Sequence, residues 1–439
     1  MKFIFENYEF DRENFVAKFH YGLGEYEFTE EVRFAKNDNN YDEKLLNSAL
    51  FLAHILIGTS YYKTFPTRDV EIRSGAIDAW QAEFFDRAYQ EGLSQFAYEN
   101  DLTRENLAHF RGAILNFAKS GANEKSAAAN RDIRETARNY FGEGILALQS
   151  GGKDSLLVAE MLREKRDEFD VLYLSSAAQN YPRVLDELSA KNVRVATRTI
   201  DRENLATAAA NGARNGHVPI TFIVAALATI QAILLNKNQI LTGVAHEGEE
   251  PREMIGDLPV NHQWAKMWAA ETAFQDYVAK YISPDIRVGS PLRQYSELAV
   301  AELFAQKCWR KFGRKFSSCN VGNYKQGAQN SALKWCGECA KCANSWLLFS
   351  PFVAEKELAA TFGVEQDLFA NPQLAETFRG LLGVDGAPKP FECVGEFAEL
   401  RKAYALAMKR GDYAPLPFAV PKSEFNYREK YEHNGDLVI

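Results

Sequence analysis

The sequence predicts an α/β protein in which a doubly wound parallel sheet follows an N-terminal α+β region and precedes a mostly helical C-terminal region. Three observations lead to this fold class. Aromatic and polar side chains alternate in the first forty residues, short apolar runs alternate with helix-like segments from about residue 142, and helical spacing dominates after residue 347. Strand–helix alternation is typical of parallel sheets, whereas a period of two is typical of half-buried antiparallel strands.

The N-terminal region, residues 1–135, is predicted to form a first domain. Its first forty residues indicate antiparallel hairpins, because Gly22 and Gly24 separate runs of alternating apolar side chains. Residues 42–58 and 76–98 are each expected to form an amphipathic helix. The Ala-rich segment 118–138 is expected to be a mobile or helical connection.

The second predicted domain, residues 136–315, contains the parallel sheet, and the third, residues 316–439, contains a zinc knuckle and helices. The expected strands are 145–148, 171–175, 193–199 and 239–242, and the expected helices between them are 155–165, 181–191 and 222–235. The chain is expected to close with a Pro-rich, irregular tail.

The charge balance argues against a nucleic-acid partner. The chain has 51 basic and 59 acidic residues, a net charge of −8 and no block of five or six like charges. The N-terminus lacks the apolar segment of a signal peptide. The longest apolar stretches, 49–58 and 223–235, are shorter than the ~20 residues that span a bilayer. We therefore expect a cytoplasmic protein without a membrane partner, and the sequence predicts no oligomeric state.

The densest chemistry lies in the hexapeptide SGGKDS at residues 150–155, which follows the first predicted strand of the sheet and begins a helix. A Walker A loop would need Gly at position 147 and Ser or Thr at 154, where this chain has Ala147 and Asp154. Residues 142–147 match a dinucleotide-binding pattern but precede their strand instead of following it. Neither of these phosphate loops is present.

Small residues in this hexapeptide let the backbone close around an anion, and Ser155 stands where a helix begins. A carboxylate at Asp154 repels phosphate unless a cation such as Mg²⁺ lies between them. The alternative is a Gly-rich turn with an Asp N-cap. The hexapeptide resembles the PP-loop of N-type ATP pyrophosphatases. This resemblance implies that the loop holds the β- and γ-phosphates of ATP while the α–β bond is cleaved and AMP is transferred to a substrate. The implied ATP-binding residues are Ser150, Gly151, Gly152, Asp154 and Ser155, with Lys153 as a catalytic residue and Asp154 as the Mg²⁺ ligand.

Four of the six cysteines form the pattern C-x16-C-x2-C-x2-C, at Cys319, Cys336, Cys339 and Cys342. Four thiolates are the ligand set of a closed tetrahedral zinc site, so the expected zinc is structural. The alternative is four unrelated buried cysteines. A similar arrangement follows the PP-loop in 7-cyano-7-deazaguanine synthase, and a ligase of that type is therefore an alternative function.

A longer resemblance covers residues from about 15 to 405. The segments that carry it are 55–67, 91–100, 215–221, 260–271, 290–305, 335–352 and 389–397, and together they resemble the UDP-N-acetylmuramoyl-L-alanyl-L-glutamate epimerase family. The resemblance implies ATP- and Mg²⁺-dependent inversion of the terminal L-Glu of UDP-MurNAc-L-Ala-L-Glu in peptidoglycan precursor synthesis. AMP and diphosphate are the implied products.

Several residues are candidates for the proton transfer. An epimerisation needs an acid/base on each face of the reacting carbon, or one group that swings. Cys393 lies outside the cysteine pattern and is a candidate proton carrier, the alternative being a small buried hydrophobe. His262 and Lys266 would share one helix face and could hold the substrate or take a proton, the alternative being a solvated face. Cys308 is expected to be a core residue.

Other residues are candidates for binding. Arg293 could pair with a substrate carboxylate through its planar fork. His217 and Gly243 are expected to lie beside the nucleotide, although packing of the loop is an equal alternative for His217. The epimerase family leads us to expect Asn-Glu after the fourth strand, where this chain has Ala-His-Glu, so that only Glu247 is carried over as a nucleotide-binding residue. His246 and Glu249 are weaker candidates.

Two further classes of function were weighed. A tRNA-thiolating enzyme is disfavoured by the negative net charge and by the lack of a second cysteine pair outside the zinc pattern. A nucleotide-binding module without catalysis is disfavoured by the intact hexapeptide.

Overall fold

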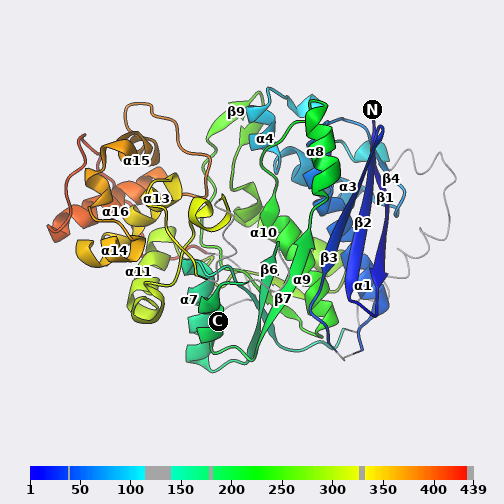
Figure 1. Cartoon of the computed structure of the whole chain (residues 1–439), viewed down its shortest axis with the longest axis horizontal. Helices are drawn as coiled ribbons and strands as arrows, with labels where there is room; N and C mark the ends of the chain where they lie inside the picture. Colours follow the sequence, from blue (N-terminus) through cyan, green and yellow to red (C-terminus); the bar gives the residue numbers. More distant parts are fainter. Residues whose placement is uncertain (38–39, 114–139, 177–180, 326–331, 433–439) are drawn as a thin grey trace.

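The structure is a computed structural model of the chain, and it describes residues 1–37, 40–113, 140–176, 181–325 and 332–432. One nine-stranded sheet crosses the molecule in the order β11-β8-β5-β6-β7-β3-β2-β1-β4. Figure 1 shows the N-terminal strands (blue) at one end of the molecule and the C-terminal helices (yellow to red) as a group at the other end. The predicted α/β class with a large parallel sheet is confirmed.

Five parallel strands form the half of the sheet that was predicted from strand–helix alternation. They are β5 (Ile145–Leu148), β6 (Phe169–Ser175), β7 (Asn192–Thr199), β8 (Gln239–Leu241) and β11 (Arg287–Gly289). Their order from β7 to β11 is third, second, first, fourth and fifth along the chain, which is the order of doubly wound sheets. Four of these strands were predicted. The three-residue β11 is too short to show a period in the sequence.

The strand order reverses at β5, whose two neighbours are β6 and β8. In doubly wound sheets, ligands bind outside the carboxyl ends of the strands at this topological switch point. The segment that leaves β5 there is the hexapeptide 150–155. The sheet topology therefore positions the motif where a ligand site is expected.

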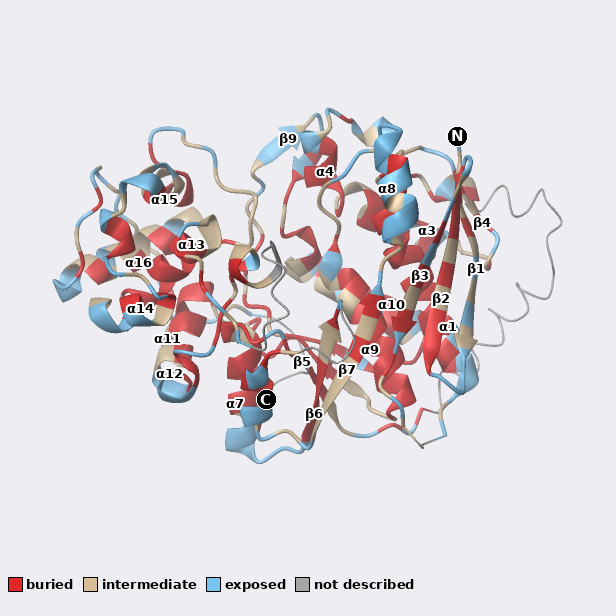
Figure 2. Cartoon of the chain, viewed as in Figure 1, coloured by how far each residue is buried: buried red, intermediate tan, exposed pale blue. Residues whose placement is uncertain are grey.

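Helices cover both faces of the parallel strands. Leu146 and Ile240 belong to the hydrophobic core that includes α9 (Ile220–Leu234). The adjacent residues Ala147 and Leu241 belong to a second core on the other face, which includes α7 (Lys153–Lys165) and α11 (Glu297–Lys307). Alternate side chains of a strand point to opposite faces, so each strand contributes to both cores. Figure 2 shows α9 almost wholly in the buried colour.

Two of the three helices predicted between the strands, α7 and α9, are confirmed. The prediction of a helix over 181–191 is wrong, because only a short 3₁₀ turn, Arg183–Glu187, forms there. This turn buries Val184 and Leu185, and the chain must then extend into β7, which leaves no room for a longer helix. A helix that was not predicted, α8 (Arg202–Ala210), follows β7.

The N-terminal hairpins are also confirmed. β1 (Phe3–Asp11), β2 (Val16–Leu23) and β3 (Tyr26–Arg33) pair antiparallel in sequence, and the short β4 (Val70–Ile72) pairs parallel with β1. β3 pairs antiparallel with β7, so that the N-terminal strands and the parallel strands share one sheet. This sheet crosses the domain boundary that the sequence suggested at residue 135.

The helix predicted over 42–58 is α1 (Glu43–Ile57), which Asp42 caps. The segment 76–98 instead forms two helices, α3 (Ala79–Gln90) and α4 (Ser94–Glu99), so the prediction of one helix is wrong. The break contains Gly92, where a Cβ would lie 3.1 Å from Pro219. A Cβ there would also lie 2.3 Å from the Ala88 carbonyl oxygen, so only glycine fits the break without a shift of its neighbours. The segment 118–138 lies outside the described residues.

One helical stretch of the described residues, Glu43–Tyr62, is long and apolar enough to cross a membrane by length and composition. It joins α1 to α2 (Thr59–Tyr62) and is longer than the apolar run seen in the sequence. In the structure, 94% of its apolar window is buried. It packs as a helix of the protein core.

The C-terminal region is mostly helical, as predicted. Its longer helices are α13 (Ala340–Phe349), α14 (Glu355–Phe362), α15 (Ala375–Leu382) and α16 (Phe397–Arg410). These helices share the second core with α7 and α11. Residues 411–432 form no helix or strand, which confirms the predicted irregular tail.

Candidate functional site

The loop between β5 and α7 is a tight turn closed by its own hydroxyl groups. Gly151 has a φ of +78°, a conformation that glycine adopts without strain. The Ser155 hydroxyl accepts a hydrogen bond from the Ser150 N–H (3.3 Å) and donates one to the Gly152 carbonyl (3.2 Å). The first N–H groups of α7 have no acceptor within the helix. This end of the helix can therefore bind an anion.

The end of strand β8 lies directly against this loop. A Cβ at Gly243 would lie 2.8 Å from the Ser155 nitrogen and 2.9 Å from the carbonyl carbon of Asp154. No larger residue fits there without moving the backbone of the loop. Gly243 therefore lies beside the motif with which the sequence analysis grouped it.

Beside the loop lies a group of five ionisable side chains, Lys153, Asp154, Glu247, Lys266 and Glu297, which we call the charged cluster. The Lys153 ammonium group contacts Asp154 (2.6 Å) and Glu297, and Lys266 contacts Glu247 (3.0 Å). Glu247 and Glu297 share a hydrogen bond. Asp154 and Lys266 are each 23% exposed and the other three members at most 8%, so these two form the open edge of the charged cluster.

Neighbouring charges keep the two lysines of the charged cluster protonated. Burial by itself would lower the pKa of Lys153, but Asp154 and Glu297 outweigh it and raise that pKa above its usual value. Burial likewise opposes the charge of Lys266, but nearby acidic groups raise its pKa, of which Cys393 and Glu247 contribute most. Both ammonium groups are thus charged at neutral pH.

The two glutamates of the charged cluster differ in their protonation. Burial and the adjacent charge of Glu247 raise the pKa of Glu297, although Lys153 acts in the opposite direction. Burial would also raise the pKa of Glu247, but Lys266 and the hydrogen bond from Glu297 lower it. Glu297 therefore stays protonated, and its carboxyl O–H donates a hydrogen bond to the Glu247 carboxylate.

His262 and Lys266 do not lie on one α-helix, so the prediction that they share a helix face is wrong. The segment forms a turn followed by a 3₁₀ helix, η3 (Trp264–Lys266), which has three residues per turn instead of 3.6. Lys266 reaches Glu247, whereas the Nδ1 of His262 lies 2.5 Å from the Oε1 of Gln95. The two side chains have different hydrogen-bond partners.

Hydrogen bonding assigns the tautomer of His262. Gln95 donates through its Nε2 to Glu99 (2.7 Å), so that its Oε1 faces His262 as an acceptor and Nδ1 carries the ring proton. Burial and the charge of Arg252 lower the pKa of His262 to about 3. The ring is therefore neutral, with a lone pair on Nε2. The His217 ring lies 4.5 Å away, and burial and His262 lower its pKa to about 3 as well.

Cys393 lies half-buried beside positive charges. The Lys341 ammonium group donates a hydrogen bond to the Cys393 carbonyl. Arg252 and Lys266 are close enough to the thiol for its charge to raise their pKa values.

Arg293 is buried, and the protein's own acceptors hold its guanidinium group. It forms a two-pronged ion pair with Glu271 (3.0 and 3.2 Å) and donates to the backbone carbonyls of Ala245 (3.0 Å) and Lys266 (2.6 Å). The prediction that Arg293 binds a substrate carboxylate remains a prediction. The contacts present hold the backbone that carries Lys266 and the segment just before Glu247.

The four cysteines of the sequence pattern come together, and we call them the cysteine cluster: Cys319, Cys336, Cys339 and Cys342. Their sulfur atoms all lie within 4.8 Å of one another, and three of the distances are 3.6 to 3.7 Å. In a tetrahedron with Zn–S bonds of about 2.3 Å, the sulfurs are about 3.8 Å apart. The N–H groups of Gly322 and Gly337 also donate to cluster sulfurs (3.2 and 3.3 Å). The cysteine cluster therefore fits a metal ion such as zinc.

The cysteine cluster borders the loop and Cys393. The Ser317 N–H donates to the Gly151 carbonyl (3.3 Å), two residues before Cys319. On the other arm, Lys341 stands between two cluster cysteines and reaches the carbonyl of Cys393. Binding of a metal would therefore hold both the loop of residues 150–155 and the segment around Cys393 in place.

The weaker candidates have structural partners. The His246 ring stacks on Tyr431, with 3.5 Å between the centroids, and Glu249 accepts a hydrogen bond from the Trp268 N–H (3.1 Å). Cys308 is fully buried in the second core, which confirms its expected place there.

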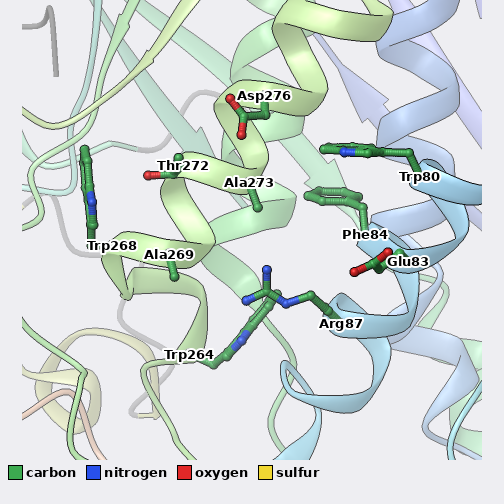
Figure 3. A pocket seen from close by; sticks show the side chains of 10 residues that line it. All are labelled: Trp80, Glu83, Phe84, Arg87, Trp264, Trp268, Ala269, Thr272, Ala273 and Asp276. Atoms are coloured by element: carbon green, nitrogen blue, oxygen red, sulfur yellow. The ribbon is translucent and has the colours of Figure 1, made fainter. Parts of the chain in front are cut away.

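An open cavity of about 480 Å³ lies between α3 and α10 (Trp268–Tyr281), and it does not include the charged cluster. Figure 3 shows Trp80 and Trp268 on opposite walls, with Arg87 and Trp264 at its base. The remaining lining residues are Glu83, Phe84, Ala269, Thr272, Ala273 and Asp276. The helix η3 contributes Trp264 to this cavity and Lys266 to the charged cluster.

Several residues at the site carried no motif in the sequence. Glu297 begins α11 after its cap, Ser296, and lies within a segment that supported the family resemblance. Gln95 and Lys341 also lie within such segments, whereas Arg252 lies outside them. The contacts in the folded chain are what bring these three residues to the site.

The fold and the site define an α/β protein with a candidate ligand site at the switch point of a doubly wound sheet and a cysteine cluster beside it. Residues 1–290 match the MurL N-terminal domain, and residues 315–429 match the MurL C-terminal domain. The chain belongs to the MurL family.

Two curated relatives extend this result. A protein of Xanthomonas oryzae pv. oryzae, named UDP-N-acetyl-alpha-D-muramoyl-L-alanyl-L-glutamate epimerase, is 33% identical over 368 residues, which cover 84% of this chain and 76% of that protein. A protein of the same name from Micromonospora sp. is 30% identical over 422 residues, covering 94% and 88%. The names of these relatives indicate an epimerase, which is an isomerase.

Proposed function

We propose that this chain inverts the terminal L-Glu of UDP-MurNAc-L-Ala-L-Glu to D-Glu for peptidoglycan synthesis, using ATP to adenylate the glutamate. The observation that carries the proposal is the continuity of the site. The charged cluster begins at the loop of residues 150–155 and reaches Cys393 through Lys266. Groups suited to phosphate chemistry and groups suited to proton transfer therefore share one site. The names of the relatives support the substrate.

The need for ATP follows from the acidity of the substrate. Removing the α-hydrogen beside a free carboxylate would place a carbanion next to a negative charge. An acyl-adenylate lacks that charge, so an enolate can form after the α-proton is removed. The reaction of ATP therefore serves to make the α C–H bond more acidic. It does not join the glutamate to a second molecule in the product.

For adenylation, a glutamate carboxylate oxygen bonds to the α-phosphorus of ATP, and the bond from that phosphorus to diphosphate breaks. We propose that the PP-loop-like residues 150–155 bind the diphosphate part of ATP. The rest of the ATP molecule is assigned to the space beside Gly243. Asp154 suits a Mg²⁺ ion because it offers a carboxylate oxygen at the open edge of the charged cluster. Lys153 neutralises charge next to it.

For inversion, we assign the thiolate of Cys393 as the base that takes the α-proton. We place the α-carbon between this thiolate and the Lys266 ammonium group, which returns a proton on the opposite face. This leaves a thiol and an amine that re-equilibrate through water. His262, neutral with a free Nε2, can accept a hydrogen bond from the substrate. Water then attacks the acyl carbon, releasing AMP and the D-Glu carboxylate.

The test is to incubate the protein with Mg²⁺, ATP and UDP-MurNAc-L-Ala-L-Glu, and to measure diphosphate release together with the chirality of the glutamate. We expect D-Glu to appear only with ATP. The same reaction without ATP is the control. Inversion without ATP would contradict the adenylation step, and diphosphate release without inversion would contradict the epimerase assignment.

A further inference from the structure

Three cations gather around Cys393: Lys266, Arg252 and Lys341. The acidic side chains of Glu392 and Glu250 act on Arg252 but form no ion pair with it among the described residues. Lys266 is paired with Glu247 at 3.0 Å. Within the described parts of the chain, neither Arg252 nor Lys341 forms a salt bridge.

Arg252 is held in place but not satisfied. Its Nη2 donates to the Gln263 Oε1 (3.3 Å) and to the Glu392 carbonyl, and its guanidinium lies 5.6 Å from the centre of the Phe391 ring. Its Nη1 is buried and has no hydrogen-bond partner among the described residues. Burial lowers the pKa of Arg252 to about 10. A buried donor without an acceptor is rare in native proteins and calls for a partner such as a ligand.

Other buried arginines show what a satisfied guanidinium looks like in this chain. Arg198 forms a two-pronged pair with Glu30, and Arg293 forms one with Glu271. Both use the planar fork of arginine against a carboxylate. Arg252 has the same fork but lacks the carboxylate.

We propose that Arg252 and Lys341 bind the γ-carboxylate of the substrate's terminal glutamate; this inference rests on the proposed function. Glutamate has two carboxylates, and adenylating the γ-carboxylate would leave the charge of the α-carboxylate in place. The α-hydrogen would then stay hard to remove. A site that epimerises this residue must therefore hold the γ-carboxylate away from ATP.

The positions of the two cations fit this role. Arg252 donates to the carbonyl of Glu392, and Lys341 donates to the carbonyl of the next residue, Cys393. The two positive groups are thus anchored on consecutive peptide units. A carboxylate bound between them lies beside the thiol, and this fixes the α-carbon of the same glutamate near the group that takes its proton.

The experiment measures binding without ATP, so that adenylation plays no part. Calorimetry compares UDP-MurNAc-L-Ala-L-Glu with its γ-amide, UDP-MurNAc-L-Ala-L-Gln. The wild-type protein should bind the glutamate form about 10²–10³-fold more tightly, because the amide leaves both cations, including the buried Nη1 of Arg252, without a carboxylate partner. Arg252→Met should reduce this preference to within about tenfold and change binding of the γ-amide little.

Arg401→Met is the matched control. Its guanidinium also lies over a phenylalanine, 5.7 Å from the Phe397 ring, and donates to the backbone carbonyls of Leu382 and Gly383. The substitution therefore removes similar contacts, but the carbonyls that Arg401 binds belong to Leu382 and Gly383 and not to the Cys393 segment. The preference for glutamate over the γ-amide should remain at the wild-type value.

Equal binding of the two ligands by the wild-type protein would overturn the proposal, and so would an unchanged preference in Arg252→Met. If Arg252→Met does not fold, Lys341→Met decides, because it must also reduce the preference. A preference that depends on these residues in a protein that never inverts glutamate would support the carboxylate site and contradict the proposed function. The two failures are therefore distinguishable.

Discussion

Among the buried charges of the described residues, two groups are built differently. In the first, which joins β3 to β7, the fully buried Glu30 accepts hydrogen bonds from Arg198 (2.5 and 3.1 Å) and from the Tyr61 hydroxyl (2.9 Å). Ser60 accepts another hydrogen bond from Arg198 (2.8 Å). In the second, the charged cluster, three acids and two lysines share their contacts, and two of the acids are joined by a proton.

The difference distinguishes a structural ion pair from a candidate functional site. Burial would lower the pKa of Arg198, but Glu30 outweighs it and raises that pKa, so this pair is complete without a ligand. The charged cluster places like charges side by side and shifts the pKa values of its members in opposite directions. Strongly perturbed pKa values in a group of charges are typical of functional sites. The complete pairing of Arg198 with Glu30 indicates a structural role. The close approach of several charges in the charged cluster indicates a role in ligand binding.

The largest effect should come from a substitution in the cysteine cluster. We expect the charged cluster to depend on the cysteine cluster and the Arg198–Glu30 pair not to depend on it. Cys339→Ser should lower zinc content, loosen the C-terminal helices and stop diphosphate release, because structural zinc binds with about 10–16 kcal/mol. The N-terminal strands around Arg198 should keep their protection. Elemental analysis and hydrogen exchange measure this, with Cys308→Ser as the control outside the cysteine cluster. Reduced protein that is folded and active without any metal would contradict the prediction.

The next effect separates chemistry from folding within the charged cluster. Asp154→Asn should lower diphosphate release by about 10³-fold or more, because it removes an anionic ligand of Mg²⁺ while Lys153 keeps its contact with Glu297. The free energy of unfolding should change by less than about 1 kcal/mol. Glu203→Gln is the control, since Glu203 is an exposed acid in the first turn of α8. Wild-type turnover in Asp154→Asn would refute the assignment of the loop.

The third prediction separates adenylation from proton transfer. Cys393→Ala should still release diphosphate, yet exchange of the glutamate α-proton with D₂O should fall by about 10²–10⁴-fold, the usual loss for an acid or base. The loop acts on phosphorus and needs no thiol. Cys308→Ala, a buried cysteine of the second core, is the control for packing. Wild-type exchange in Cys393→Ala would make the thiol structural and leave His262 and Lys266 as the next pair to change.

The fourth prediction concerns the structural pair. Arg198→Met should destabilise the fold by about 3–5 kcal/mol, because it leaves the buried Glu30 unpaired. The double variant Glu30→Leu/Arg198→Met should recover much of this loss. Urea unfolding measures both, with Arg33→Met on the exposed face of β3 as the control, expected within about 0.5 kcal/mol. If Arg198→Met were as stable as the wild type, the pair of Arg198 and Glu30 would not be a structural ion pair, and its contrast with the charged cluster would be lost.

The smallest effect is a pH dependence beside the charged cluster. Glu399 on α16 is buried and accepts a hydrogen bond from the Leu298 N–H (2.7 Å), and burial raises its pKa from 4.5 to about 7. The folded protein therefore holds this proton up to about pH 7, whereas the unfolded chain releases it near 4.5. Stability from this group is present below pH 4.5 and is lost as the pH rises through 7, by at most about 3 kcal/mol.

Glu399→Gln should remove this loss, because the amide stays neutral and can still accept the hydrogen bond. Urea unfolding at pH 5 and pH 8 should show a smaller difference between the two values in the variant than in the wild type. Glu376→Gln, at an exposed acid of α15, is the control. An identical pH slope in wild type and Glu399→Gln would show that Glu399 is ionised in the fold.

The sequence by itself determined the features that depend on short stretches of chain. Strand β5, the loop of residues 150–155 and the start of α7 follow from one run of about twenty residues with its own period and turn chemistry. The cysteine cluster follows from spacing, because two residues between cysteines place both thiols on one side of a turn. The alternating aromatic residues near Phe3 and Phe19 likewise specify hairpins without help from the rest of the chain.

Only the tertiary structure decided which distant residues meet. Pro219 packs against Gly92 at the break between α3 and α4, and Gln95 sets the tautomer of His262 across more than 160 residues. Glu297 and Arg252 join the site although no motif marks them. The physical reason is that propensities and turn rules act over a few residues, whereas burial and charge pairing depend on which elements the sheet brings together. Arg293 is the clearest case, because the sequence shows only that its planar fork can pair with a carboxylate, and packing places Glu271 against it.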